Sequence, residues 1–153
     1  MRVIFREGII ASFLSVVLIS IINIFASKSN LICSTSCAYT LAWHNLFNKI
    51  GFILILIVPC IYYTMIRKDK SETFALFLTS LILWFTGFAD VLFFWLQGKA
   101  IPHTMPWLNN HIVIGKIREL IGLGVVTDAI LLISVMSGFV MVIYLDIWLE
   151  KVN

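Results

Sequence analysis

The chain has 153 residues, of which 61% are hydrophobic and only 12% are charged. A soluble domain has roughly 45–50% apolar and about 25% charged residues, so this composition excludes an ordinary soluble protein and predicts a polytopic membrane protein. The net charge of +3 at pH 7 comes from dispersed residues, and no long basic run occurs. The sequence therefore does not predict nucleic-acid binding.

Four apolar segments are each long enough for a membrane-spanning helix, which needs about 20 residues. The first exceeds the roughly 7–15-residue core of a cleavable signal peptide, so we expect it to persist as a span. Pro59 falls inside the second, where we expect a kink. The predicted spans cover residues 8–26, 49–66, 73–96 and 120–145. The sequence therefore predicts an all-α integral membrane protein, a bundle of four transmembrane helices forming one domain over residues 1–153.

The basic residues predict the orientation of these helices. Those in very short segments, where the positive-inside rule is strongest, fall on the side of both termini, which we therefore assign to the cytoplasm. They are Arg2, Arg6, Arg67, Lys68, Lys70 and Lys151. The longest loop, 97–119, would then be extracytoplasmic, and we expect the plasma membrane. Its prolines, Pro102 and Pro106, predict that it folds back as a lid, or that Trp107 anchors it at the interface.

Each predicted span carries one face of polar or small residues, a pattern typical of contacts between membrane helices. On the third span, Thr79, Thr86 and Asp90 fall within roughly 40° of one another on a helical wheel. Counted from the ends of their spans, Asp90 and Asp128 would both lie roughly 10 Å below the outer surface. Acidic residues inside a membrane are costly and often mark a functional site.

Polar residues near the outer ends of all four predicted spans therefore suggest an acidic chamber close to the extracytoplasmic face. We expect its ligand-binding or functional residues to be Asp90, Asp128, Asn23, Asn48 and Glu119. Two carboxylates that approach closely would share a proton. The structural alternative is that each acid is held by hydroxyl groups or by a basic residue of the loop.

The three histidines offer nitrogen ligands beside these acids. His44, His103 and His111, with Asp90 or Asp128, could form a nitrogen and oxygen site for zinc or iron. No pair has the close helical spacing of a metalloprotease motif, and histidines in loops are often simply solvated. A metal cofactor is thus compatible with the sequence but not required by it.

The cysteines Cys33 and Cys37 lie in the connector after the first predicted span. An extracytoplasmic location permits oxidation, so we expect them to be able to form a disulfide that staples this loop. Cys60 lies within an apolar segment and is interpreted as a packing residue.

Three functions fit these observations, and the sequence does not identify a ligand or a reaction. The leading hypothesis is a small membrane protein whose acidic chamber binds or passes a cation or a small lipid-like ligand. The second is a membrane-embedded enzyme, metal-dependent or not, that acts on a lipid or quinone-like substrate. The third is a non-catalytic accessory subunit of a larger membrane complex. We expect membrane lipids as partners, with a homo-oligomer or a larger complex as further options.

Overall fold

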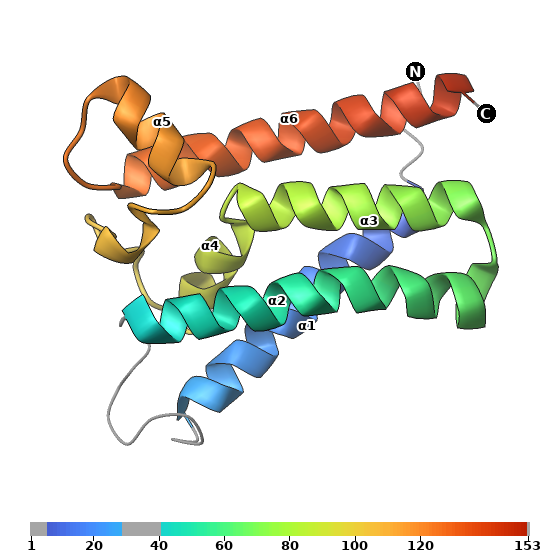
Figure 1. Cartoon of the computed structure of the whole chain (residues 1–153), viewed down its shortest axis with the longest axis horizontal. Coiled ribbons are helices and arrows are strands. Elements are labelled where there is room, and N and C mark those ends of the chain that lie inside the picture. The colour runs from blue at the N-terminus through green and yellow to red at the C-terminus, as the bar shows by residue number, and fades with distance from the viewer. Residues whose placement is uncertain (1–5, 29–40, 153) are drawn as a thin grey trace.

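The computed structural model describes residues 6–28 and 41–152, without the side chains of residues 26–28, 41–48, 67 and 152. The described chain is helical, with one isolated β-bridge between Thr104 and Thr127. Figure 1 shows the order of the elements along the chain. The helices are α1 (Glu7–Lys28), α2 (Leu41–Ile61), α3 (Lys70–Phe85), α4 (Phe88–Trp95), α5 (Ile114–Ile121) and α6 (Asp128–Val152), with a π-helical turn at Tyr62–Arg67 and a 3-10 turn at Pro106–Leu108.

Three of these helices are long and apolar enough to cross a membrane. The qualifying windows are Glu7–Phe25 in α1, Lys49–Ile66 in α2 and its π-helical turn, and Asp128–Lys151 in α6. A fourth is added if α3 and α4 are counted as one broken span, because together they pass the same test. The all-helical prediction is confirmed, and the second apolar segment coincides with its predicted residues, 49–66.

The third predicted span, 73–96, is not one straight helix. α3 ends at Phe85, and α4 leaves it at an angle of 70°. The break occurs at Gly87, which has φ +84°, and a Cβ there would lie 2.5 Å from a methyl group of Leu131. Only glycine fits both this backbone conformation and this space. The helical wheel that placed Asp90 on the same face as Thr79 therefore does not apply, because the two residues belong to different helices.

The fourth predicted span, 120–145, also has different boundaries. The short helix α5 ends at Ile121 and is capped by Gly122, which has φ +76°, and α6 begins only at Asp128. Asp128 is therefore the first residue of α6 and does not lie two turns inside a helix, which corrects the depth assigned to it from the sequence. α6 then continues to Val152.

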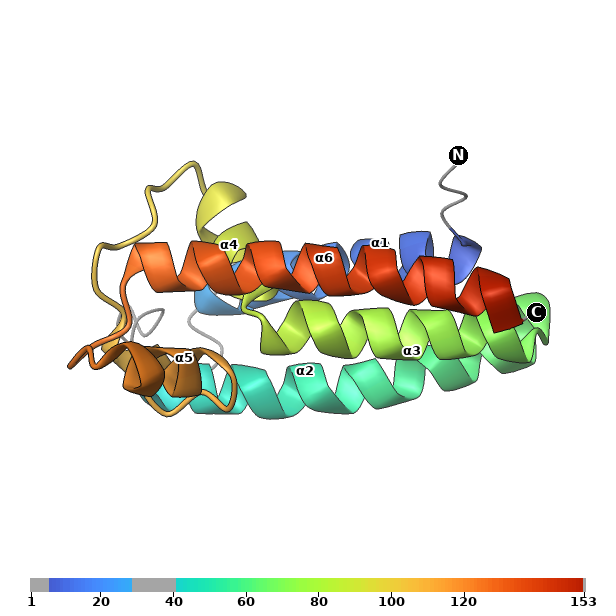
Figure 2. The same ribbon diagram turned by 90° about the horizontal axis from the view of Figure 1, so that it is seen from above.

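Helix α3 lies between α2 and α6, and α1 also packs against it (Figures 1 and 2). Glycines permit these close approaches. Gly8 of α1 lies against the backbone of Glu72, and Gly138 of α6 lies against the side chain of Thr86. α3 is thus the central helix of the bundle, and the sequence-based expectation that small residues mark helix contacts is met at these positions.

Arg6 ties three helices together at one end of the bundle. Its guanidinium donates to the Ser71 hydroxyl at 2.7 Å and to the Leu149 carbonyl at 3.1 Å, and it pairs with Glu72 at 3.4 Å. Glu72 also accepts a 2.7 Å hydrogen bond from the Gly8 backbone N–H. We call this group, Arg6 with Ser71, Glu72 and the Leu149 carbonyl, the Arg6 clamp. The ends of α1, α3 and α6 are therefore joined by charged hydrogen bonds.

Candidate functional site

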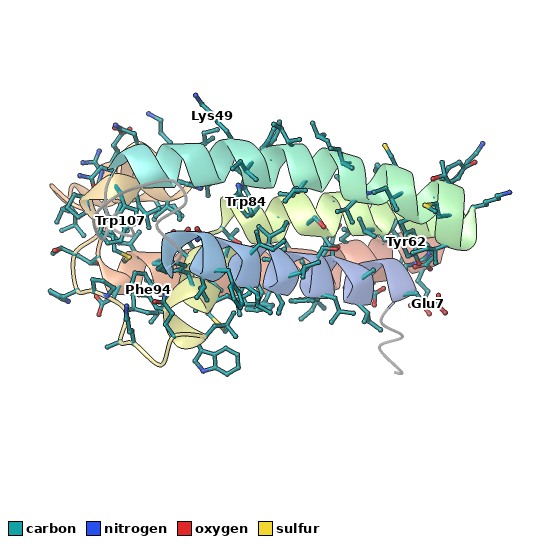
Figure 3. The ribbon with its side chains drawn as sticks, turned by 90° about the horizontal axis from the view of Figure 1, so that it is seen from below. Glu7, Lys49, Tyr62, Trp84, Phe94 and Trp107 are labelled. Atoms are coloured by element: carbon teal, nitrogen blue, oxygen red, sulfur yellow. The ribbon has the colours of Figure 1, made fainter. Side chains whose placement is uncertain are left out.

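The segment between α4 and α6 folds into a small subdomain, which we call the cap (residues 99–127). Its apolar side chains form a second hydrophobic core against the first turns of α6, separate from the core between the long helices. The fully buried members in the cap are Met105, Leu108, Ile114 and Val126. Figure 3 shows Trp107, in the cap, at the end of the molecule opposite to Glu7.

Hydrogen bonds within the cap fix the path of its backbone. The Met105 N–H donates to the Val126 carbonyl at 2.8 Å, and the Val126 N–H donates to the Asn109 side-chain oxygen at 2.9 Å. The Arg118 guanidinium donates to the Gly124 carbonyl at 3.0 Å. Because its backbone is anchored at several points and its apolar residues are buried, the cap has the construction of a folded layer and provides a fixed wall for a site.

A cavity of about 440 Å³ lies where α2, the end of α3 and the cap meet. Its volume falls within the roughly 300–1,000 Å³ typical of small-molecule sites. The residues that line it are Lys49, Phe52, Trp84, Phe85, Asn110, His111 and Ile112. Three aromatic rings and one aliphatic side chain thus form an apolar interior, and three polar side chains are available to orient a ligand.

The aromatic wall is held by contacts between helices. Trp84 of α3 is 5% exposed, and its ring lies against Gly51 of α2, where any larger residue would overlap it. Figure 3 shows Lys49 on α2 and Trp84 on the neighbouring α3. The Phe85 ring and the His111 imidazole pack edge-to-face, with their centroids 6.5 Å apart. The cavity wall is therefore built by packing between segments distant in the sequence.

His111 connects the cavity to Asp90. Its Nδ1 accepts the Ile114 backbone N–H at 3.4 Å. Asp90, half-buried in the first turn of α4, lies within electrostatic reach of the same imidazole. Asp90, which was predicted as a functional acid, is therefore close to a residue that lines the cavity, although Asp90 itself does not line it.

Asp128 has a different histidine as its partner. Its Oδ1 lies 3.1 Å from Nδ1 of His103 and also accepts the Ala129 backbone N–H at 2.9 Å. The side chains of His103 and Asp128 are 84% and 38% exposed, so this pair is open to water. Asp90 and Asp128, predicted at matched depth in one chamber, thus interact with two separate histidines, one beside the cavity and one on the exposed rim of α6.

The other predicted residues fall in several places. Asn23 is buried in α1, and its Oδ1 has no hydrogen-bond partner among the described residues. Glu119 is exposed on the cap, where its hydrogen bond with Lys116 and the positive charge of Lys116 hold the pKa of this carboxyl below its usual range. The side chains of Asn48 and His44 lie outside the described residues, as do both Cys33 and Cys37.

The proposed metal site receives no support from the part of the chain that the structure describes. Within it, no three histidine, cysteine, aspartate or glutamate side chains gather closely enough to hold a metal ion. His103 contacts Asp128, whereas His111 lies within electrostatic reach of Asp90.

Sequence reasoning missed most of the cavity. Lys49 was interpreted only through its position at the start of a span, and Trp84, Phe85 and Asn110 received no role. The available signal was a tryptophan close to Gly87 in the third apolar segment, but this signal does not reveal which loop packs beside the tryptophan. His111 alone among the lining residues was a candidate from the sequence.

Comparison with protein families, with curated proteins and with solved structures finds no match to this chain.

Proposed function

We propose that this chain is a four-span membrane protein that binds a small lipid-like molecule in the cavity between α2, α3 and the cap. In this proposal α3 and α4 cross the membrane as one broken span, and both termini lie in the cytoplasm. The cavity and the cap then lie at the extracytoplasmic side of the plasma membrane. The apolar windows of α1, α2 and α6 and the combined test passed by α3 with α4 support this arrangement.

The single observation that carries the proposal is the lining of the cavity. Phe52, Trp84 and Phe85 present aromatic surface to its interior, and Lys49, Asn110 and His111 supply the polar groups. Sites for small organic ligands combine a mostly apolar wall with a few placed polar groups in the same way. A molecule with an apolar body and a polar end matches this division.

The position of the cavity along α2 supports the same class of ligand. Lys49 is the first residue of the apolar window of α2, so the polar part of the cavity lies at one end of a span and the apolar part faces inward. A lipid-like molecule could then keep its polar end at the membrane surface. No carboxylate belongs to the lining residues, which favours this ligand over the cation that the sequence had also suggested.

The proposal is tested by photolabelling the purified protein in nonionic micelles with a single-chain alcohol that bears a photoreactive group. We expect labelled peptides from α2, the end of α3 and residues 110–112. Ile112→Trp places a large ring at a lining residue and should reduce labelling about tenfold, which corresponds to a loss of roughly 1.4 kcal/mol of binding free energy.

Ile121→Trp is the matched control, because Ile121 is an exposed apolar residue of the same cap that does not line the cavity. It should leave labelling unchanged. Equal labelling of both variants and of the wild type would show that the cavity is not the binding site and would contradict the proposal.

A second candidate function is acid–base catalysis on such a ligand, and the position of Asp90 favours it. A carboxylate and a histidine close to each other commonly take part in proton transfer. Here Asp90 lies within electrostatic reach of His111, which lines the cavity. Mass spectrometry of lipids from cells that produce wild type or Asp90→Asn should then show a product that depends on Asp90. Identical lipid profiles in both, and in cells without the protein, would contradict a catalytic role.

A further inference from the structure

We infer that the ligand of this cavity is a single-chain amphiphile with an anionic head group, bound by Lys49 together with His111 and Asn110. The inference rests on the proposed function of the cavity and assigns the chemical class of its ligand.

The charge of the lining is the first argument. Lys49 is the one permanently charged residue of the lining, and it forms no ion pair among the residues that the structure describes. Lys116 of the cap, by contrast, donates to Glu119 at 2.6 Å. An unpaired ammonium at the mouth of an apolar cavity creates a positive potential there, and an anion is its complement.

The two other polar residues of the lining add to this positive charge. The Asn110 side chain can donate through its amide. The His111 imidazole is the third polar group beside them. An ammonium and an amide donor suit the oxygens of a carboxylate or phosphate, which form strong hydrogen bonds with charged donors.

The volume limits the size of the molecule. At about 30 Å³ per heavy-atom group, the volume of one liquid water molecule, a cavity of about 440 Å³ holds roughly 15 such groups. This is enough for a small head group with part of one alkyl chain, packed against Phe52, Trp84 and Phe85. The cavity therefore encloses one chain, and the second chain of a phospholipid would have to lie outside it, so a single-chain amphiphile is the better match.

The experiment measures displacement of the photoreactive alcohol by four compounds with the same C16 chain: the carboxylate, the phosphate monoester, the alcohol and the trimethylammonium. The full-length protein is used in nonionic micelles. We expect at least one anion to bind about tenfold or more tightly than the alcohol, as gained charge-assisted hydrogen bonds imply. The order of carboxylate and phosphate identifies which anion the site prefers.

Lys49→Gln should remove the preference for the anion and leave the affinity for the alcohol unchanged. Lys99→Gln is the matched control, because Lys99 is an exposed lysine, the first residue of the cap, and does not line the cavity. This control should keep the full preference, which separates recognition in the cavity from attraction of anions to a positively charged protein surface.

Two results would overturn the inference while the proposed function stands. One is equal affinity for anion and alcohol in a wild type whose labelling is still blocked by Ile112→Trp. The other is an anion preference that survives Lys49→Gln or disappears equally in Lys99→Gln. If Ile112→Trp does not affect labelling at all, the cavity is not a binding site, and both the proposed function and this inference fail.

Discussion

The Arg6 clamp allows the packing at the end of the bundle opposite to the cap to be tested with one substitution. Arg6 and Glu72 have side chains that are only 16% and 19% exposed. Arg6→Ala removes the bonds to Ser71, Glu72 and the Leu149 carbonyl. The backbone hydrogen bonds at this end, from Gly8 to Glu72 and from Arg6 to the buried Asp146 of α6, do not depend on the Arg6 side chain and would remain.

The expected cost follows from the burial of the pair. A hydrogen bond to a charged group contributes about 1.5–3 kcal/mol, and losing one partner of a fully buried ion pair costs about 3–5 kcal/mol. Both Arg6 and Glu72 keep some contact with water, and the bonds of one guanidinium are not additive. We therefore expect Arg6→Ala to lower the free energy of unfolding by about 2–4 kcal/mol.

The measurement is equilibrium unfolding in mixed micelles, followed by helical circular dichroism. Lys70→Ala is the matched control, since Lys70 is an exposed cation at the same end, and it should change the free energy by less than about 0.5 kcal/mol. A double-mutant cycle with Glu72→Ala should give a coupling energy of roughly 0.5–3 kcal/mol. Arg6→Lys should recover only part of the loss, because lysine cannot reach several acceptors with one planar group.

The reasoning would be refuted by an Arg6→Ala protein as stable as Lys70→Ala. A large loss without measurable coupling to Glu72 would show that Arg6 acts through packing and not through the ion pair.

Three further predictions concern glycines and the cap. Gly87→Ala should destabilise the fold by about 1–3 kcal/mol, since its Cβ would overlap neighbouring methyl groups at an unfavourable φ; a wild-type melting curve would contradict this. Gly138→Ala should cost a similar amount in the same assay, because its Cβ would lie 2.5 Å from the Thr86 hydroxyl oxygen. Lys116→Gln should raise the pKa of Glu119 toward its usual value, measured by NMR titration. In the wild type this pKa is lowered, so the ion pair between Lys116 and Glu119 is complete above the ordinary carboxyl pKa and is lost as pH falls through the lowered value. An unchanged pKa of Glu119 in Lys116→Gln would show that Lys116 is not the cause of the shift.

Features that depend only on neighbouring residues in the sequence could be predicted, and features that depend on contacts between distant segments could not. The apolar windows of α1 and α2 lie within a residue or so of the predicted spans, because the tendency to avoid water is a property of each segment's own side chains. The same is true of the all-helical class. The bend at Gly87 was not predicted, because a glycine is also compatible with a straight membrane helix. The packing of Leu131 and Ile114 against it is a tertiary contact.

The candidate site shows the same division. The sequence indicated that Asp90 and the histidines matter at one end of the bundle, since buried acids are costly. It could not pair them, and it placed Asp90 with Asp128 because both were counted along straight helices. The tertiary structure instead brings His111 to Asp90 and His103 to Asp128.

The composition and its apolar segments thus determined what kind of chain this is, an all-helical one with helices apolar enough to cross a membrane. Only the tertiary structure decided where a ligand could bind. Lys49, Trp84 and His111 come from α2, α3 and the cap, and they surround one cavity because three segments pack together. Hydrophobic patterns record the transfer of each segment out of water, whereas a cavity depends on distances between segments, which no local pattern contains.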